Sequence, residues 1–345
     1  MPTAAVDLFL ASSAMLLIIL GAIYGVNTVV KPHLEEVHIP LDRYHPIGKY
    51  MLLSRGEPEG WGAGGDPTVL GFASDGGAYE LDIDKVTRLN PSNAHAVNYS
   101  RLWQAQGIDD VSFRIRVEPL FNVTLSPVSS QSQGDETAYT FSASTTRRGY
   151  PLPASLRYYV AVRDHTDSGM GSTGADGTGA VEFTLPNSLN GTALLVVLAR
   201  VEQSVTSYGV LRFSHSSGPV DPDGTFATLS PHNYTLDVNV SGGASALNAA
   251  VFSYGYVFNL TTGAGGSYTV PRLLDASPMV LVVTGLNGSS YWAEWTAYPQ
   301  VPLVVGADMS DPHAISDVAS ISYVVKVKGA LYSFEVRFRS PAEDD

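Results

Sequence analysis

The hydrophobic residues of this chain follow different patterns in its amino-terminal, middle and carboxy-terminal parts. Leu8 to Val30 is an almost uninterrupted apolar run in which only Asn27, near one end, is strongly polar. As a helix rising about 1.5 Å per residue it would be roughly 34 Å long, enough to cross a hydrocarbon core of about 30 Å. A helix buried in a globular core would keep a polar face, which this segment lacks. The pattern therefore predicts one membrane-spanning helix.

A cleavable secretory signal is the main alternative for this apolar run. The apolar region of such a signal is usually about 7 to 15 residues long, shorter than the run seen here. No Lys or Arg precedes Leu8, and no clear A-x-A cleavage site follows Val30. We therefore expect residues 1–45 to form the helix and a stalk, with Pro32 and Pro40 as breaks.

Residues 46–125 have a mixed pattern that predicts a small α+β module. Asp and Asn residues placed before short periodic runs indicate helix starts, and strict alternation of apolar and polar residues indicates a half-buried strand. The expected elements are helices over Lys85–Leu89, capped by Asp84, and over Ala94–Gln106, capped by Asn93, and strands over Val69–Phe72 and Val111–Val117.

From Ser126 onward the pattern is all-β, with short runs rich in Val, Tyr, Phe and Thr separated by turn residues. This spacing is typical of β-sandwiches, and we expect one over residues 126–217 and a second over 225–345. Asp164–Gly179 is expected to be an exposed loop between two strands. The expected strands are Tyr139–Ser144, Leu156–Arg163, Ala180–Leu185, Ala193–Val201, Tyr208–Phe213, Tyr234–Val240, Ala249–Phe258, Gly266–Val270, Met279–Thr284, Tyr291–Ala297, Ser320–Val327 and Leu331–Phe338.

The segment GADGTGAVEFTLP, Gly174–Pro186, resembles the turn and strand of immunoglobulin-like domains of cell-surface proteins. This likeness concerns the fold alone. The expected fold class is mainly β, with an N-terminal transmembrane or pilin-like helix, a small α+β module and two immunoglobulin-like β-sandwiches.

Composition narrows the classes of function. The chain has 345 residues and a formal net charge of −13, which disfavours nucleic-acid binding because that role needs a basic surface. It contains no cysteine, which excludes thiol catalysis, disulfides and Cys-ligated metal sites.

Glycosylation sequons decide the expected side of the membrane. The basic residues near the apolar run, Lys31, Arg43 and Lys49, all follow it and taken alone would place the bulk of the chain in the cytoplasm. Against this, roughly two N-x-[ST] sequons would occur by chance in this composition, and the chain has seven. Glycosyl transfer requires an exterior location. The sequons, all candidate glycosylation sites, begin at Asn98, Asn122, Asn190, Asn233, Asn239, Asn259 and Asn287.

The sequence contains few residues or motifs that indicate catalysis or metal binding. The eight histidines are scattered without an HExxH pair, and no G-x-S-x-G nucleophile elbow or P-loop occurs. Asp164, Asp167 and Asp176 could offer hard oxygen ligands to a surface calcium ion, although Asp in a Gly-rich turn is usually turn chemistry. We therefore expect no catalytic, cofactor or metal residues, and we expect a protein that is not an enzyme.

Several features follow one another along the chain: an apolar helix with an acid near its start, and then the segments YMLLSRGEPEGWG, LDIDKVTRLN, YSRLW and VSFRIRVEPL. This ordered set resembles archaeal type IV pilin-like surface proteins over roughly residues 5–120. The resemblance implies secretion by a pilin-type route and anchoring or assembly through the helix. Prepilins carry a basic residue just before the helix, and here none is present. Asp7, and Gly21 and Gly25 in a G-x-x-x-G pattern, are the candidate assembly residues of the helix.

These patterns predict an extracellular structural protein, either a pilin-like filament subunit or a membrane-anchored surface glycoprotein. An adhesin that binds carbohydrate or a surface layer is the alternative, and an extracellular hydrolase is a third. The expected partners are the membrane, further copies of the chain through the helix, and a surface-layer or glycan partner, with no nucleic acid.

Overall fold

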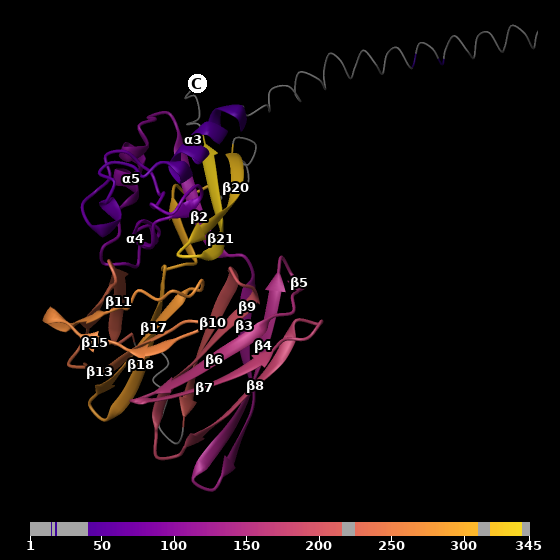
Figure 1. The fold of residues 1–345 in the computed structure, drawn as a ribbon, viewed down its shortest axis with the longest axis vertical. Helices are drawn as coiled ribbons and strands as arrows, with labels where there is room; N and C mark the ends of the chain where they lie inside the picture. Colours follow the sequence, from indigo (N-terminus) through magenta and orange to yellow (C-terminus); the bar gives the residue numbers. More distant parts are fainter. Residues whose placement is uncertain (1–14, 16–17, 19–40, 216–224, 310–317, 340–345) are drawn as a thin grey trace, which may run out of the picture.

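A computed structural model of the chain describes residues 15, 18, 41–215, 225–309 and 318–339. The protein is mainly β, as predicted, and the described residues form one five-stranded sheet and four four-stranded sheets. The α+β part, here called the head module, lies at one end of the molecule, and the other four sheets lie at the opposite end (Figure 1). Most of the predicted membrane helix, Leu8–Val30, falls outside the described residues, and within them no helix is both long and apolar enough to span a bilayer.

The head module is built from both ends of the described chain. Its sheet has the order β1-β20-β21-β2-β19, in which β1 and β20 are parallel and the other neighbours are antiparallel. Helices α3 and α5 pack on one face, where Tyr44 stacks on Phe338 and Tyr99 meets Phe113 edge-on. The elements are α3 (Leu41–Leu53), η2 (Trp61–Ala63), β1 (Glu80–Leu81), α4 (Ile83–Thr87), α5 (Tyr99–Gln106), β2 (Ser112–Pro119), β19 (Leu303–Gly306), β20 (Val318–Val327) and β21 (Ala330–Arg339).

This sheet corrects the expected place of the last two strands. The runs Ser320–Val327 and Leu331–Phe338 are strands, as predicted, but they pair with each other and with β2 rather than with a second sandwich. Apolar alternation indicates that a segment is a strand and which face is buried, but it does not identify the neighbouring strand.

The helix starts in the head module differ from the sequence prediction. Asp82, not Asp84, caps α4 by accepting hydrogen bonds from the N–H groups of Asp84 and Lys85. Asn98, not Asn93, caps α5, which ends at Gly107 in the left-handed conformation. Asp84 lies in the first turn of α4, and Asn93 lies five residues before the cap of α5, so in both places a neighbouring Asx residue had the side chain expected of a cap. The expected strand Val69–Phe72 forms a single β-bridge, at Val69.

The first pair of sheets covers Asn122–His215. One sheet has the order β3-β4-β5 with β8 paired to β4, and the other has the order β10-β9-β6-β7. Their inner faces share one core, which includes Phe141, Val181, Leu156 and Leu195. The strands are β3 (Asn122–Gln133), β4 (Glu136–Arg147), β5 (Tyr150–Pro151), β6 (Ser155–Val162), β7 (His165–Ser172), β8 (Thr178–Pro186), β9 (Gly191–Glu202) and β10 (Val205–His215).

The segment Asp164–Gly179, expected to be a loop, contains strand β7, so that expectation is wrong. The strand pairs with β6 over its whole length and turns back at Thr173–Gly177. Its sequence, HTDSGMGS, has few β-branched or aromatic residues because it is an edge strand with little buried surface.

The second pair of sheets covers Ala227–Tyr298. The orders are β11-β12-β16-β15 and β14-β13-β17-β18, and the core between them continues into the head module. The strands are β11 (Ala227–His232), β12 (Thr235–Val240), β13 (Ser245–Phe252), β14 (Val257–Asn259), β15 (Thr261–Thr262), β16 (Ser267–Thr269), β17 (Met279–Asn287) and β18 (Ser290–Tyr298), with a short η3 (Ala264–Gly266).

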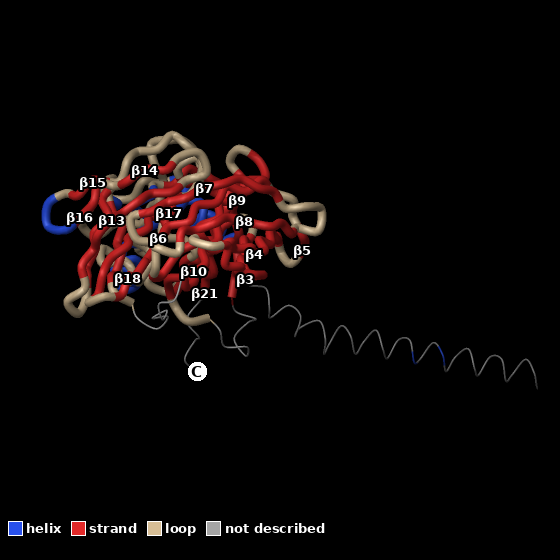
Figure 2. Tube along the Cα trace, turned by 90° about the horizontal axis from the view of Figure 1, so that it is seen from below, coloured by secondary structure: helices blue, strands red, loops and turns tan. Residues whose placement is uncertain are grey.

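The two pairs of sheets stack on each other to give four layers. The outer face of the β10-β9-β6-β7 sheet packs on the β14-β13-β17-β18 sheet through a third core, which includes Tyr159, Leu194, Phe252 and Val280. Figure 2 shows the layers in order, from β15 and β16 on one side to β4 and β5 on the other. The two middle sheets are therefore buried on both faces, which explains the unbroken apolar runs Ala193–Ala199 in β9 and Met279–Val283 in β17.

Candidate functional site

The seven predicted glycosylation sites lie at the surface of the described residues. Asn287 is half-buried and the other six are exposed, so none is buried in a core. Asn98 accepts a hydrogen bond from the Arg101 N–H at its carbonyl oxygen, which leaves its amide nitrogen available. The expectation of surface positions agrees with the structure, and glycan attachment stays a prediction.

The other predicted residues do not form a site. Asp7, Gly21 and Gly25 lie outside the described residues. Asp164 and Asp176 lie before and after β7, so the length of that strand separates them. Asp176 accepts hydrogen bonds from the hydroxyl and the N–H of Thr178, which lower the pKa of its carboxyl, as in turn chemistry.

Among the described residues, no three His, Asp or Glu side chains come close enough to hold a metal ion.

A first polar cluster joins the head module to the second pair of sheets. Asp84, which is buried, accepts hydrogen bonds from the Tyr298 hydroxyl at 2.6 Å and from the Asn233 N–H at 2.7 Å. Burial raises the pKa of the Asp84 carboxyl, although these two hydrogen bonds oppose the shift. The bonds join α4 to the β11–β12 turn and to the end of β18, so this cluster fixes the junction.

Two histidines lie in the same junction. The rings of His95 and His232 stack with centroids 4.4 Å apart. The His232 Nε2 lies 2.9 Å from the Gly62 carbonyl oxygen, and the His95 Nε2 lies 2.7 Å from Asp237. Burial and the neighbouring His95 lower the pKa of His232. Each of these hydrogen bonds joins a residue of the head module to one of the second pair of sheets, so the cluster holds the two parts together.

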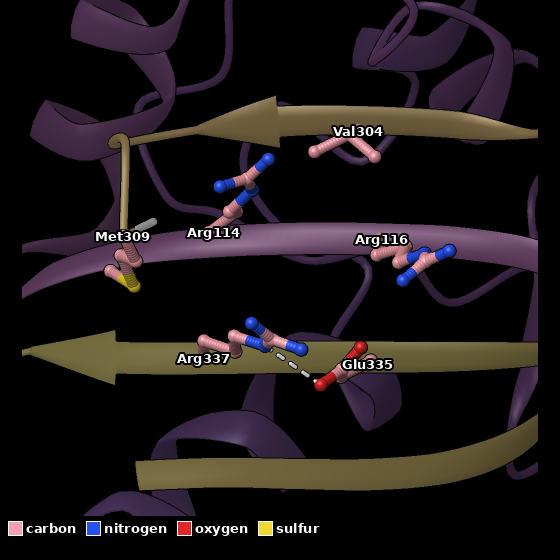
Figure 3. Close-up of a pocket in the computed structure, with 6 residues that line it drawn as sticks. All are labelled: Arg114, Arg116, Val304, Met309, Glu335 and Arg337. Carbon is pink, nitrogen blue, oxygen red and sulfur yellow. Dashed lines mark hydrogen bonds and ion pairs between the residues drawn. The ribbon is translucent and has the colours of Figure 1, made fainter. Parts of the chain in front are cut away.

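A second cluster forms an open pocket on the head module. Its cavity of about 340 Å³ lies on the face of the sheet opposite to α3 and α5. Figure 3 shows the side chains on three neighbouring strands, with the helices behind the sheet. The lining residues are Arg114 and Arg116 of β2, Val304 of β19, Glu335 and Arg337 of β21, and Met309.

Three arginines line this pocket, and each forms an ion pair with one nearby carboxylate. Arg337 donates from Nε to Glu335 at 2.8 Å, and Arg116 lies 2.5 Å from Glu118. Burial alone would raise the pKa of Glu335, but hydrogen bonds from Ser320 and Arg337 outweigh it and lower that pKa. Glu335 is therefore an anion that holds Arg337 in place at neutral pH.

Part of this pocket was predictable from the sequence. Arg114 and Arg116 are the polar positions of the alternating run at Val111–Val117, so their exposure was predictable. Arg337 and Glu335 alternate in the same way, but only the pairing of β2 with β21 brings the two sets together. Arginines held in place by carboxylates can bind an anion through their remaining N–H donors, and the pocket is the candidate functional site.

Comparison of the chain with protein-family models, with curated proteins and with solved structures gives no match. The residues and their geometry are thus the basis for a functional proposal.

Proposed function

We propose that the protein is an extracellular surface glycoprotein, held at the membrane or in a filament by its N-terminal apolar helix. The observation that carries this proposal is the position of α3. This helix follows the apolar run in sequence and lies at the end of the head module, while the four stacked sheets extend to the opposite end (Figure 1). A helix in the membrane would then present the stacked sheets away from it.

The strand orders support two immunoglobulin-like sandwiches as the presented part. In the first pair of sheets, β3, β4, β6, β7, β8, β9 and β10 can be lettered A, B, C, C′, E, F and G, leaving out the short β5. The two sheets then have the orders A-B-E and G-F-C-C′. In the second pair, β11 to β18 can be lettered A, B, C, C′, D, E, F and G in chain order, and the sheets have the orders A-B-E-D and C′-C-F-G. These are the orders of immunoglobulin-type sandwiches, which are common in cell-surface proteins. That likeness concerns fold, and the surface role rests on the sequons and the helix.

Cell-surface location is testable on the native protein. Intact cells are treated with protease, and the glycopeptides of the protein are measured by mass spectrometry. We expect cleavage without lysis and a glycan on one or more of the seven sequons, Asn98, Asn122, Asn190, Asn233, Asn239, Asn259 and Asn287. A protein that is protected until lysis and carries no glycan would overturn the proposal.

Anchoring and assembly are two forms of this function, and one variant separates them. Gly21→Leu with Gly25→Leu widens the helix surface that would pack against other copies but keeps it apolar. In a filament subunit the variant stays in the membrane fraction and disappears from sheared extracellular material. In an anchored glycoprotein both fractions are unchanged.

A further inference from the structure

Two arginines of the pocket face each other across the inner strands of the head sheet. Arg114 of β2 and Arg337 of β21 are directly opposite in the antiparallel register. Like charges in this position destabilise a sheet. Proteins retain such local conflicts mainly where they serve a function.

The acids nearby leave much of the donor capacity of the arginines unused. Arg337 and Arg116 each contact one carboxylate closely, and the nearest acid to Arg114 is Asp308 at 3.6 Å, counting described residues alone. Each guanidinium has five N–H donors in a planar fork that suits a carboxylate. The three side chains are 32%, 48% and 40% exposed for Arg114, Arg116 and Arg337, so a ligand can reach them.

The remaining walls of the pocket are apolar. Val304 and Met309 line it beside the arginines; Val304 is 41% exposed, whereas Met309 is buried at 6%. A ligand that fits must therefore carry an anionic group next to a surface of C–H groups. Acidic sugars have this combination, because a carboxylate sits on a ring with apolar faces.

The backbone of the pocket disfavours an acidic peptide. The arginines lie on β2 and β21, and each of these strands pairs with a neighbour on both sides, while the free edge of the sheet beside the pocket is the outer side of β19. Peptides that bind sheets usually add a strand at a free edge. A ligand held between Arg114 and Arg337 is not at such an edge, so it has to be recognised by side chains.

We propose that this pocket binds the uronic-acid units of an acidic polysaccharide, with Arg114 and Arg337 clamping one carboxylate and the exposed Val304 contacting the ring. In addition, no sequon lies on β2, β19, β20 or β21, so none of the predicted N-glycans is attached to these strands. The argument from glycans rests on the proposed function, whereas the arginines and the apolar wall do not depend on it.

The test is calorimetric titration of the full-length protein in detergent with trigalacturonic acid. We expect binding that weakens at least tenfold in Arg114→Gln with Arg337→Gln, and that weakens in Arg114→Lys with Arg337→Lys because the fork is lost. Arg147→Gln with Arg148→Gln is the matched control, since it removes two exposed positive charges at the turn before β5 and should bind like the wild type.

Competing occupants give distinct results. Equal binding of pentaglutamate would replace the sugar by an acidic peptide and overturn the proposal, as would the absence of trigalacturonate binding. The assay uses purified protein, so its failure leaves the proposed surface location untouched.

Discussion

At the scale of single residues, Asp84 connects three separate parts of the chain. Its Oδ1 accepts both the Tyr298 hydroxyl and the Asn233 N–H, and it belongs to α4 of the head module. A buried carboxylate is costly unless its hydrogen bonds are made, and a buried donor is costly if its acceptor is removed. The junction therefore depends on an acceptor at this position more than on its charge.

Replacement of Asp84 tests this directly. Asp84→Ala should lower the free energy of unfolding by about 1–3 kcal/mol, because two donors lose their acceptor. Asp84→Asn should cost less than about 1 kcal/mol, since one amide oxygen accepts both bonds and burial already disfavours the charge. Urea unfolding monitored by tryptophan fluorescence measures both. Equal losses for the two variants would contradict a role as acceptor.

His232 makes the junction sensitive to acid. Its pKa in the folded protein is lowered by burial and by His95, so below its unfolded pKa of about 6.5 the unfolded chain binds more protons than the folded one. Stability is therefore complete above about pH 6.5 and falls as the pH decreases toward the lowered folded pKa.

We expect His232→Gln to flatten this part of the curve of unfolding free energy against pH. His165→Gln on β7, outside the junction, is the control and should leave the curve unchanged. A wild-type slope retained in His232→Gln would mean that other groups cause the acid sensitivity.

At the scale of elements, β9 and β8 show how burial on two faces differs from burial on one. Neighbouring residues of β9 lie in different cores: Leu195 is in the core of the first pair of sheets, and Leu194 is in the core between the two middle sheets. In β8, Val181 is buried and Glu182 is exposed. The sequence reflects this difference, because Ala193–Ala199 of β9 are all apolar, whereas apolar and polar residues alternate over Val181–Leu185 of β8.

This difference predicts a pattern of stability effects. Leu194→Ala and Leu195→Ala should each cost about 2–5 kcal/mol, because each leaves a cavity in a full core. On β8, Val181→Ala should destabilise the protein while Glu182→Ala changes stability by less than about 0.5 kcal/mol. Denaturant titration of the four variants measures this. A small effect of Leu194→Ala would mean that the two middle sheets do not pack in solution.

Local patterns predicted elements better than partners. The strand over Val111–Val117 and most strands after Ser126 were recoverable because alternation and β-branched content report burial. The cap of α4 was displaced from Asp84 to Asp82, and β7 was missed, because competing caps and an exposed edge strand leave little local signal. The arginine pocket required the register of β2 with β21, which no pattern within one strand contains.

At the scale of the whole molecule, the head module is completed by strands from the far end of the sequence. Phe334 and Phe338 of β21 pack in the same core as Trp61, Phe72 and Phe113. In the sheet order, β20 and β21 lie between β1 and β2. The head module therefore cannot close until this late segment has been made.

A chain that ends at residue 317 tests this organisation. Removal of β20 and β21 takes out the middle of the sheet and exposes the apolar residues that pack against Phe334 and Phe338, whereas the core between the middle sheets keeps all its strands. We expect hydrogen exchange, measured by mass spectrometry on the full chain and the truncated one, to show lost amide protection in α4, α5 and β2. Protection in β6 and β9 should remain, because their partners lie within residues 122–215. Protection retained in β2 would mean that the head module folds without its carboxy-terminal strands. A uniform loss of protection would mean that the head module and the two pairs of sheets unfold as one unit.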